Sequence, residues 1–166
     1  MANRLASLLV LSIFIVLSIS ICAANYDLKK NVLYRDGKRV TGTFLLNSEK
    51  YSVKGKFVNS MADEIFERYS PDKKLVAKYF FVRGELKRTE IFYKNNNLMV
   101  VNADDESKIY FNNGQLAIDF WDHETEGTTI YHENEKPLAV YKTNSNNAQI
   151  TEIYNEKGKL LYSGED

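Results

Sequence analysis

Hydrophobic and polar residues alternate in short runs along most of this chain, with a period of two. In one such run Leu116, Ile118 and Phe120 fall on one side, and Ala117, Asp119 and Trp121 fall on the other. Successive side chains of a strand point to opposite faces of a sheet, so this alternation predicts β-strands. Residues 60–68 also contain helix-forming residues, but their flanks fit the strand pattern, and we expect a strand over 64–69.

A short phrase recurs from Tyr34 onward: an aromatic residue, a few polar residues that usually include Gly or Asn, and then an aliphatic residue. Gly and Asn supply the positive φ of a tight hairpin turn, and the flanking aromatic and aliphatic residues can then contact across the paired strands. The phrase occupies residues 34–40, 69–75, 81–86, 93–98, 110–116, 131–138 and 154–160. Spacings near 21–24 residues between several copies indicate degenerate hairpin repeats. The alternative is an ordinary antiparallel meander with similar turns.

Two of these stretches carry a family resemblance. Residues 33–44 resemble a variant MORN repeat of the type also found in YwqK-family proteins, and residues 110–116 are similar to the same core phrase, Tyr-Tyr-x-Asn-Gly-x-Leu. The resemblance covers most of residues 32–162 and implies an elongated sheet of successive hairpins with a binding or scaffold role. The chain departs from the family in its scarcity of Gly after the turns, where only Gly42 and Gly55 are suitably placed.

The predicted fold is therefore all-β: a single-layer antiparallel sheet of successive β-hairpin repeats, MORN-like, preceded by an N-terminal signal helix. We expect residues 1–24 to be a signal peptide and residues 25–166 to be one β-hairpin repeat domain. Within that domain we expect residues 25–31 to form a polar lead-in and residues 163–166 to fray.

The N-terminal segment has the features of a secretory signal. Arg4 precedes an uncharged run from Leu5 to Ile21, and the small residues Ala23 and Ala24 follow. This order predicts cleavage after residue 24 or 23 and a secreted, periplasmic or cell-envelope protein of a bacterium. Two alternatives stay open, an uncleaved anchor helix and a lipid-modified Cys22, and either would attach the chain to a membrane through its N-terminus.

Composition narrows the classes of function. The 166 residues include 22 basic and 22 acidic side chains, and removal of residues 1–24 would leave a net charge near −1 and no Cys. Nucleic-acid binding by bulk electrostatics and a disulfide scaffold are both disfavoured. The 44% hydrophobic content is too high for a disordered chain.

No residue pattern indicates catalysis. The two His residues, His123 and His132, have acidic neighbours and could approach each other on paired strands, but a nine-residue spacing is no known ligand signature. The acidic run 104–106 forms no complete calcium loop, and no nucleophile elbow or phosphate loop is present. We therefore expect no enzyme activity, no metal and no cofactor.

Aromatic residues give the better functional hypothesis. A single-layer sheet cannot bury aromatic residues on both of its faces, so one side can serve as a binding platform. The candidate residues are Phe92, Phe120, Trp121 and Tyr131. The sequence thus predicts an exported, non-enzymatic module that binds a protein or a cell-surface polymer through its sheet face. The alternative, which follows from the YwqK resemblance, is an antitoxin or immunity-type protein of a toxin–antitoxin pair.

Overall fold

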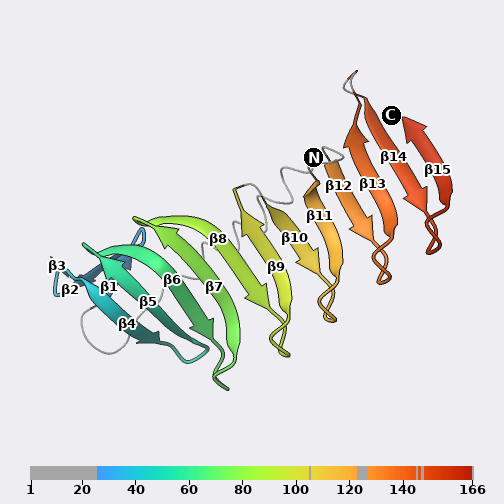
Figure 1. The fold of residues 1–166 in the computed structure, drawn as a ribbon. Helices are drawn as coiled ribbons and strands as arrows, with labels where there is room; N and C mark the ends of the chain where they lie inside the picture. The colour runs from blue at the N-terminus through green and yellow to red at the C-terminus, as the bar shows by residue number, and fades with distance from the viewer. Residues whose placement is uncertain (1–25, 105, 123–126, 145, 147, 166) are drawn as a thin grey trace. The chain divides into compact units, whose positions relative to one another are not determined.

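The computed structural model describes residues 26–104, 106–122, 127–144, 146 and 148–165, and the side chains of residues 26–29, Trp121 and Asp122 are not among the described atoms. The predicted signal peptide, residues 1–24, therefore lies outside the described residues. The regular secondary structure of the described part of the chain consists of β-strands joined by turns and loops (Figure 1). Their bounds are Tyr26–Lys29 (β1), Val32–Arg35 (β2), Lys38–Arg39 (β3), Gly42–Asn47 (β4), Ser52–Val58 (β5), Met61–Tyr69 (β6), Leu75–Val82 (β7), Glu85–Phe92 (β8), Leu98–Ala103 (β9), Ser107–Tyr110 (β10), Leu116–Asp122 (β11), Gly127–Tyr131 (β12), Pro137–Thr143 (β13), Gln149–Tyr154 (β14) and Leu160–Glu165 (β15).

The prediction of an all-β chain of successive antiparallel hairpins in an open sheet is confirmed. The expected strand over residues 64–69 is also confirmed, as the second half of β6. Two expectations at the ends were wrong. Residues 26–29 form β1, which pairs with β2, and residues 163–165 continue β15, which pairs with β14. In both places cross-strand pairing overrides the polar local sequence.

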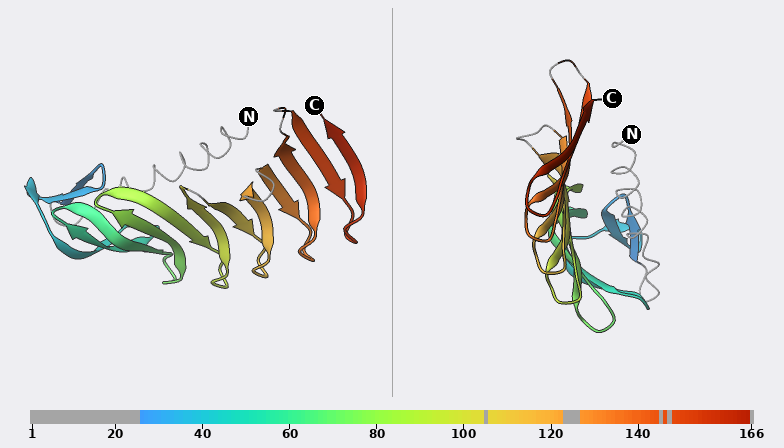
Figure 2. Two further views of the ribbon diagram at one scale, coloured as in Figure 1. Left: turned by 45° about the horizontal axis from the view of Figure 1, so that its top comes forward. Right: turned by 90° about the vertical axis from the view of Figure 1, so that its right-hand side faces the viewer.

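The described chain forms two compact units, the first ending at Lys87 and the second beginning at Arg88. In the first unit β4, β5, β6 and β7 pair in chain order as antiparallel neighbours. The β1–β2–β3 ribbon joins β6 through Val32 opposite Met61, and it stands out from the plane of β6 and β7 (Figure 2). Two-residue turns with positive φ at both positions, such as Asp36-Gly37 and Asn59-Ser60, shape this unit.

The core of the first unit is a line of aromatic rings. Phe44, Phe57, Phe66 and Phe81 contact one another edge to face, with centroids 5.9, 5.1 and 5.0 Å apart. Phe57, Phe66 and Phe81 are buried, as is Leu33 of the β1–β3 ribbon. Each such side chain stabilises the fold by about 2–3 kcal/mol through burial alone.

The second unit is a meander in which each strand from β8 (residues 88–92) to β15 pairs with its neighbour in the chain. Its hairpins repeat one turn. The N–H of the first turn residue donates to the carbonyl of the fifth, and the N–H of the fourth donates to the carbonyl of the first, at 2.8–3.0 Å. The five copies of the turn, including one in the first unit, are residues 70–74, 93–97, 111–115, 132–136 and 155–159.

The fourth residue of each copy has positive φ, as a type I turn followed by a bulge requires. These residues are Lys73, Asn96, Gly114, Glu135 and Gly158. One extra residue follows each turn on the second strand, at Val76, Met99, Ala117, Leu138 and Leu161. Turn and bulge recur together, so the described structure supports true hairpin repeats over chance similarity of turns.

Candidate binding surface

The strand register sorts the side chains of the second unit onto two unlike faces. One face, here called the aliphatic face, carries one row of directly paired residues that is apolar in every strand. The row is Ile91, Val100, Ile109, Ile118, Ile130, Ala139, Ile153 and Tyr162. β-branched side chains favour such cross-strand packing, so this row stabilises the register of the meander.

The opposite face, here called the ionic face, carries mostly charged and polar residues in the neighbouring row, here called the polar row. The polar row is Glu90, Val101, Lys108, Asp119, Thr129, Val140, Glu152 and Ser163. Arg88 lies between two carboxylates, with Nε 2.9 Å from Glu90 Oε1 and Nη1 2.5 Å from Glu106 Oε2. Lys108 continues the chain of charges, with Nζ 3.4 Å from Glu106 and 3.7 Å from Asp119. Opposite charges alternate along this line, so the network carries little net charge and orders the side chains of three strands.

Aromatic residues form a regular row on the ionic face. Each is the last residue of a strand that leads into one of the repeated turns. Each stands two residues after a member of the polar row and directly before the turn. The row, here called the aromatic row, is Phe92, Tyr110, Tyr131 and Tyr154. Its members lie two strands apart, so successive rings repeat about every 10 Å along the sheet. They pair with Leu98, Leu116, Pro137 and Leu160.

The tyrosines of this row differ in their surroundings. Burial raises the pKa of the Tyr110 phenol, which lies among the ionic side chains of the network. The Tyr154 hydroxyl donates to Glu152 Oε2 at 2.8 Å, and this bond raises the pKa of Tyr154. Both phenols therefore stay neutral at ordinary pH, as half-buried rings with polar tips.

Side chains of the repeated turns reach from one turn to the next. The Tyr93 hydroxyl donates to the Tyr110 carbonyl at 2.8 Å, and Asn95 Nδ2 donates to the Asn112 carbonyl at 3.1 Å. The same two positions recur later in the unit. His132 Nε2 lies 3.3 Å from the Tyr154 carbonyl, and Asn134 Nδ2 donates to the Glu156 carbonyl at 2.7 Å. These bonds space the hairpins evenly.

An open hollow of about 470 Å³ lies among these turns. Here Asn113, the counterpart of Asn95 and Asn134, donates to Gln115 of its own turn at 2.6 Å. The lining combines the rings of Phe111, Tyr131 and His132 and one aliphatic side chain with an amide and two carboxylates. The lining residues are Phe111, Tyr131, His132, Glu133, Asn134, Leu138 and Glu156.

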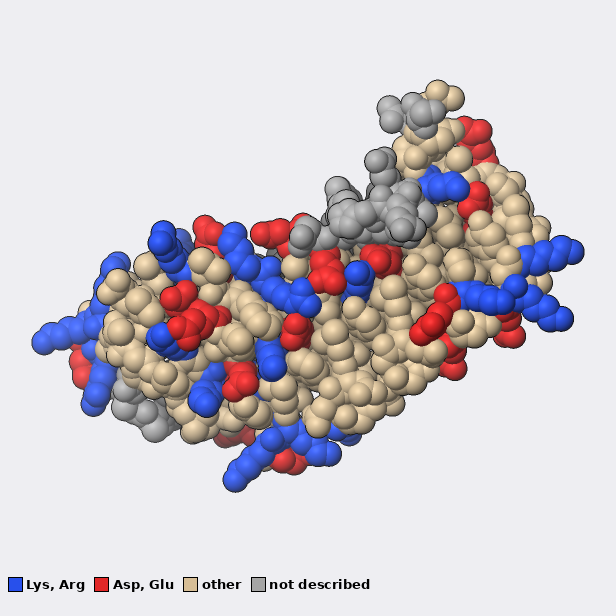
Figure 3. Space-filling view, in the orientation of Figure 1, with Lys and Arg blue, Asp and Glu red and all other residues tan. Residues whose placement is uncertain are grey.

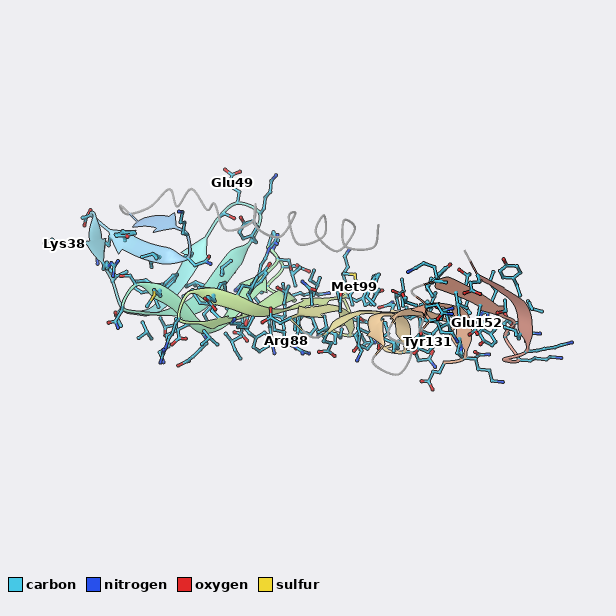
Figure 4. All side chains as sticks on the ribbon, turned by 90° about the horizontal axis from the view of Figure 1, so that it is seen from above. Lys38, Glu49, Arg88, Met99, Tyr131 and Glu152 are labelled. Atoms are coloured by element: carbon cyan, nitrogen blue, oxygen red, sulfur yellow. The ribbon has the colours of Figure 1, made fainter. Side chains whose placement is uncertain are left out.

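The structure does not bring all four predicted site residues together. Phe92 and Tyr131 belong to the aromatic row, and Tyr131 also lines the hollow; Figure 4 labels Tyr131 with Arg88 and Glu152 of the ionic face. Phe120 alternates with Asp119 and so lies on the aliphatic face, opposite to Phe92 and Tyr131. Trp121 is in β11 by its backbone, and its side chain lies outside the described atoms.

Sequence reasoning did not select Tyr110 and Tyr154 as site residues, although both complete the aromatic row. The sequence does contain a pattern that marks these two positions, because Tyr110 and Tyr154 each begin a copy of the repeated phrase. In the hairpin with the turn at residues 93–97, the phrase assigned Tyr93 to this position, but the register gives it to Phe92. One residue of offset moves a side chain to the other face of a sheet.

The two His residues of the metal hypothesis are not brought together within the described residues. His132 contacts the Tyr154 carbonyl, whereas His123 lies outside the described part of the chain, so their approach stays a prediction. Among the described residues no three His, Cys, Asp or Glu side chains gather closely enough to hold a metal ion. In the same portion of the chain, no helix has the length and apolar character for crossing a membrane.

No protein-family model matches the chain, and no curated protein matches it. The resemblance to MORN repeats therefore stays a prediction from the phrase itself. The described structure supports the repeat but assigns no family.

Proposed function

We propose that the protein is an exported, non-enzymatic repeat module that binds an extended protein segment or cell-surface polymer along the ionic face of its second unit. The observation that carries this proposal is the aromatic row, which presents one ring per hairpin at a constant two-strand interval. An extended ligand needs contacts at regular intervals along its length, and a meander of hairpins with the same turn and register supplies them.

The chemistry of the surface supports a polar, extended ligand. Half-buried rings offer stacking area, and the neighbouring ionic side chains and the hollow offer hydrogen-bonding groups. Figure 3 shows acidic and basic side chains intermixed on the visible face of the second unit. A mixed surface favours a ligand held by shape and stacking over one attracted by bulk charge.

The test is retention of the purified protein on isolated peptidoglycan, chitin and cellulose, together with capture of binding partners from an envelope extract. We expect Tyr110→Ala and Tyr131→Ala each to weaken retention at least roughly tenfold, since loss of an aromatic contact in a binding centre costs more than about 1.4 kcal/mol. Trp121→Ala is tested in the same series, because Trp121 is a predicted contact.

Tyr141→Ala is the matched control. Tyr141 lies on the aliphatic face and is 42% exposed, so this variant removes the same ring from the other side of the sheet. Retention that falls equally in Tyr141→Ala and Tyr131→Ala, with both variants folded, would contradict binding through the ionic face. Absence of any retained polymer or captured protein would contradict the proposed function itself.

The antitoxin or immunity role remains the alternative proposal. It predicts that the captured partner is a toxin encoded beside this gene. The proposed location is the cell envelope or the exterior, and the intact mass of the exported protein tests it. That mass distinguishes a chain that begins at Asn25 from one with a lipidated Cys22 and from an unprocessed chain.

A further inference from the structure

The hollow lies at the step of the meander where the bonds between successive turns are interrupted. At the steps before and after it, the third residue of one turn, Asn95 or Asn134, donates to the carbonyl of the second residue of the next turn. At the middle step the equivalent residue, Asn113, donates to Gln115 of its own turn. Among the described residues, the carbonyl of Glu133 therefore receives no bond of this kind, and Glu133 lines the hollow.

The side chains around the hollow leave acceptors in excess of donors. Their nitrogens are directed at backbone carbonyls: His132 Nε2 lies 3.3 Å from the Tyr154 carbonyl, and Asn134 Nδ2 donates to the Glu156 carbonyl at 2.7 Å. The carboxylates of Glu133 and Glu156 make no ion pair and no hydrogen bond with any residue that the structure describes. This lining favours a ligand that supplies N–H donors.

The hollow also favours a positively charged ligand. No Lys or Arg is among its described lining residues. Lys136 lies in the same turn as Glu133, but its Nζ donates to the Lys157 carbonyl at 3.1 Å. A cation in the hollow would therefore gain from the carboxylates of Glu133 and Glu156, and the aromatic rings beside them would add cation–π attraction.

A guanidinium group matches this lining better than an ammonium group. It has five N–H donors in one plane, and its flat face stacks on aromatic rings. Its apolar stem can lie against Leu138. The chain itself contains both kinds of contact. The guanidinium of Arg68 lies over the Tyr51 ring, 4.4 Å from its centroid, and Arg88 lies between two carboxylates of the ionic face.

We infer that the hollow binds the guanidinium group of an arginine side chain in an extended polypeptide. Glu133 and Glu156 pair with the group, and the rings of Phe111 and Tyr131 lie beside it. Guanidinium groups are side chains of polypeptides, whereas cationic sugars carry ammonium groups, so the lining favours a protein segment over a sugar polymer. This inference rests on the proposed function and names the class of its ligand.

The experiment is an NMR titration of the purified, ¹⁵N-labelled protein with the peptide acetyl-Ser-Gly-Ser-Gly-Arg-Gly-Ser-Gly-Ser-amide. Nine extended residues span about 30 Å, so this peptide also reaches rings of the aromatic row on both sides of the hollow. We expect the largest shift changes at residues 131–134 and 156. Citrulline in place of Arg keeps the shape and removes the charge, and should raise the dissociation constant at least roughly tenfold.

Two substitutions in the hollow test its carboxylates. Glu133→Gln and Glu156→Gln should each raise the dissociation constant of the Arg peptide roughly tenfold. The matched control is Glu135→Gln, which removes the same charge from the same turn as Glu133. Glu135 is exposed and is not among the lining residues, so this variant should bind like the wild type. Circular dichroism verifies that each variant keeps its strands.

Three results would overturn the inference. One is a citrulline peptide that binds as tightly as the Arg peptide, and another is an equal loss of affinity in Glu135→Gln and Glu133→Gln. The third is tighter binding of a chitosan tetramer, which would assign an amino sugar to the hollow. Retention or capture that depends on Tyr110 but not on Glu133 and Glu156 would leave the proposed function standing and overturn this inference alone.

Discussion

Individual glycines in this protein have different physical roles, and Gly55 illustrates the least obvious one. Its φ is not positive, so backbone conformation does not require Gly there. A Cβ at this position would stand only 2.2 Å from Cδ1 of Phe66, whose ring lies directly over the bare backbone. Phe66 in turn contacts Phe57 and Phe81. Gly55 is therefore part of the aromatic core of the first unit.

Gly55→Ala should lower the free energy of unfolding by about 1–3 kcal/mol, because the added methyl group overpacks the core. Equilibrium urea unfolding measures this effect. In a Phe66→Leu background the same Gly55→Ala change should cost less, since the ring that it displaces is gone. Equal costs in the two backgrounds would mean that Phe66 does not limit the space at Gly55.

At the scale of the hairpin, the same few contacts recur with different residues. In the β13–β14 pair, Glu152 accepts from Lys142 Nζ at 2.9 Å and from the Tyr154 hydroxyl at 2.8 Å. In the first unit Tyr69 donates to Glu67 in the same i to i−2 arrangement. In both hairpins a carboxylate two residues before the tyrosine therefore holds the tyrosine hydroxyl in place. In the β13–β14 pair the ion pair between Lys142 and Glu152 also links the two strands.

Lys142 and Tyr154 lower the pKa of Glu152 below its ordinary value of 4.5. A carboxylate with a lowered pKa stabilises the folded state above its unfolded pKa, and this contribution is lost as the pH falls through the folded pKa. Glu152→Gln should therefore cost about 0.5–1 kcal/mol at pH 7, and the difference from the wild type should shrink on acidification below pH 4.5.

Urea unfolding at a series of pH values follows this difference. The control is Glu135→Gln, which removes an exposed turn carboxylate. A stability difference between Glu152→Gln and the wild type that persists unchanged at acid pH would show that the contacts of Glu152 do not depend on its charge.

At the scale of the whole molecule, the two units bury their side chains differently. The first unit contains a ring cluster in which Phe57 and Phe66 are fully buried, and Leu33 of the same unit is fully buried too. In the second unit Val101 is fully buried, but most strand residues are half-buried on one face or the other. Stability in such a meander is approximately a sum of contacts between neighbouring hairpins, so it need not be uniform along the chain.

Hydrogen exchange measured by mass spectrometry should therefore show slower exchange in β5 and β6 than in β13 and β14, by at least about tenfold. Gly55→Ala should accelerate exchange in the first unit and leave β13 and β14 unchanged. Uniform exchange along the chain, or acceleration of both units by this one substitution, would show instead that the whole chain unfolds as one cooperative block.

Much of the fold could be predicted because strand periodicity is local. The alternation of residues 116–120 indicated the strand β11, but its assignment of faces was wrong: the bulge at Ala117 places Leu116 opposite Tyr110 on the ionic face, and Ile118 lies on the aliphatic face. The phrases placed Tyr69 opposite Leu75, Tyr110 opposite Leu116 and Tyr154 opposite Leu160, as the register confirms. The candidate surface was predicted less well. The phrase paired Tyr131 with Leu138, whereas the register places Pro137 opposite Tyr131 and leaves Leu138 as the bulge residue.

The chain's own order of residues specified strands, turns and their succession, since these depend on neighbours a few positions apart. The sorting of aromatic and aliphatic side chains onto separate faces required the folded register. A single bulge residue follows each copy of the five-residue turn and shifts the later side chains of that strand by one place. The residues of the paired strands must meet before that shift is fixed. The hollow likewise exists only once the meander has formed, because three successive turns contribute to its lining.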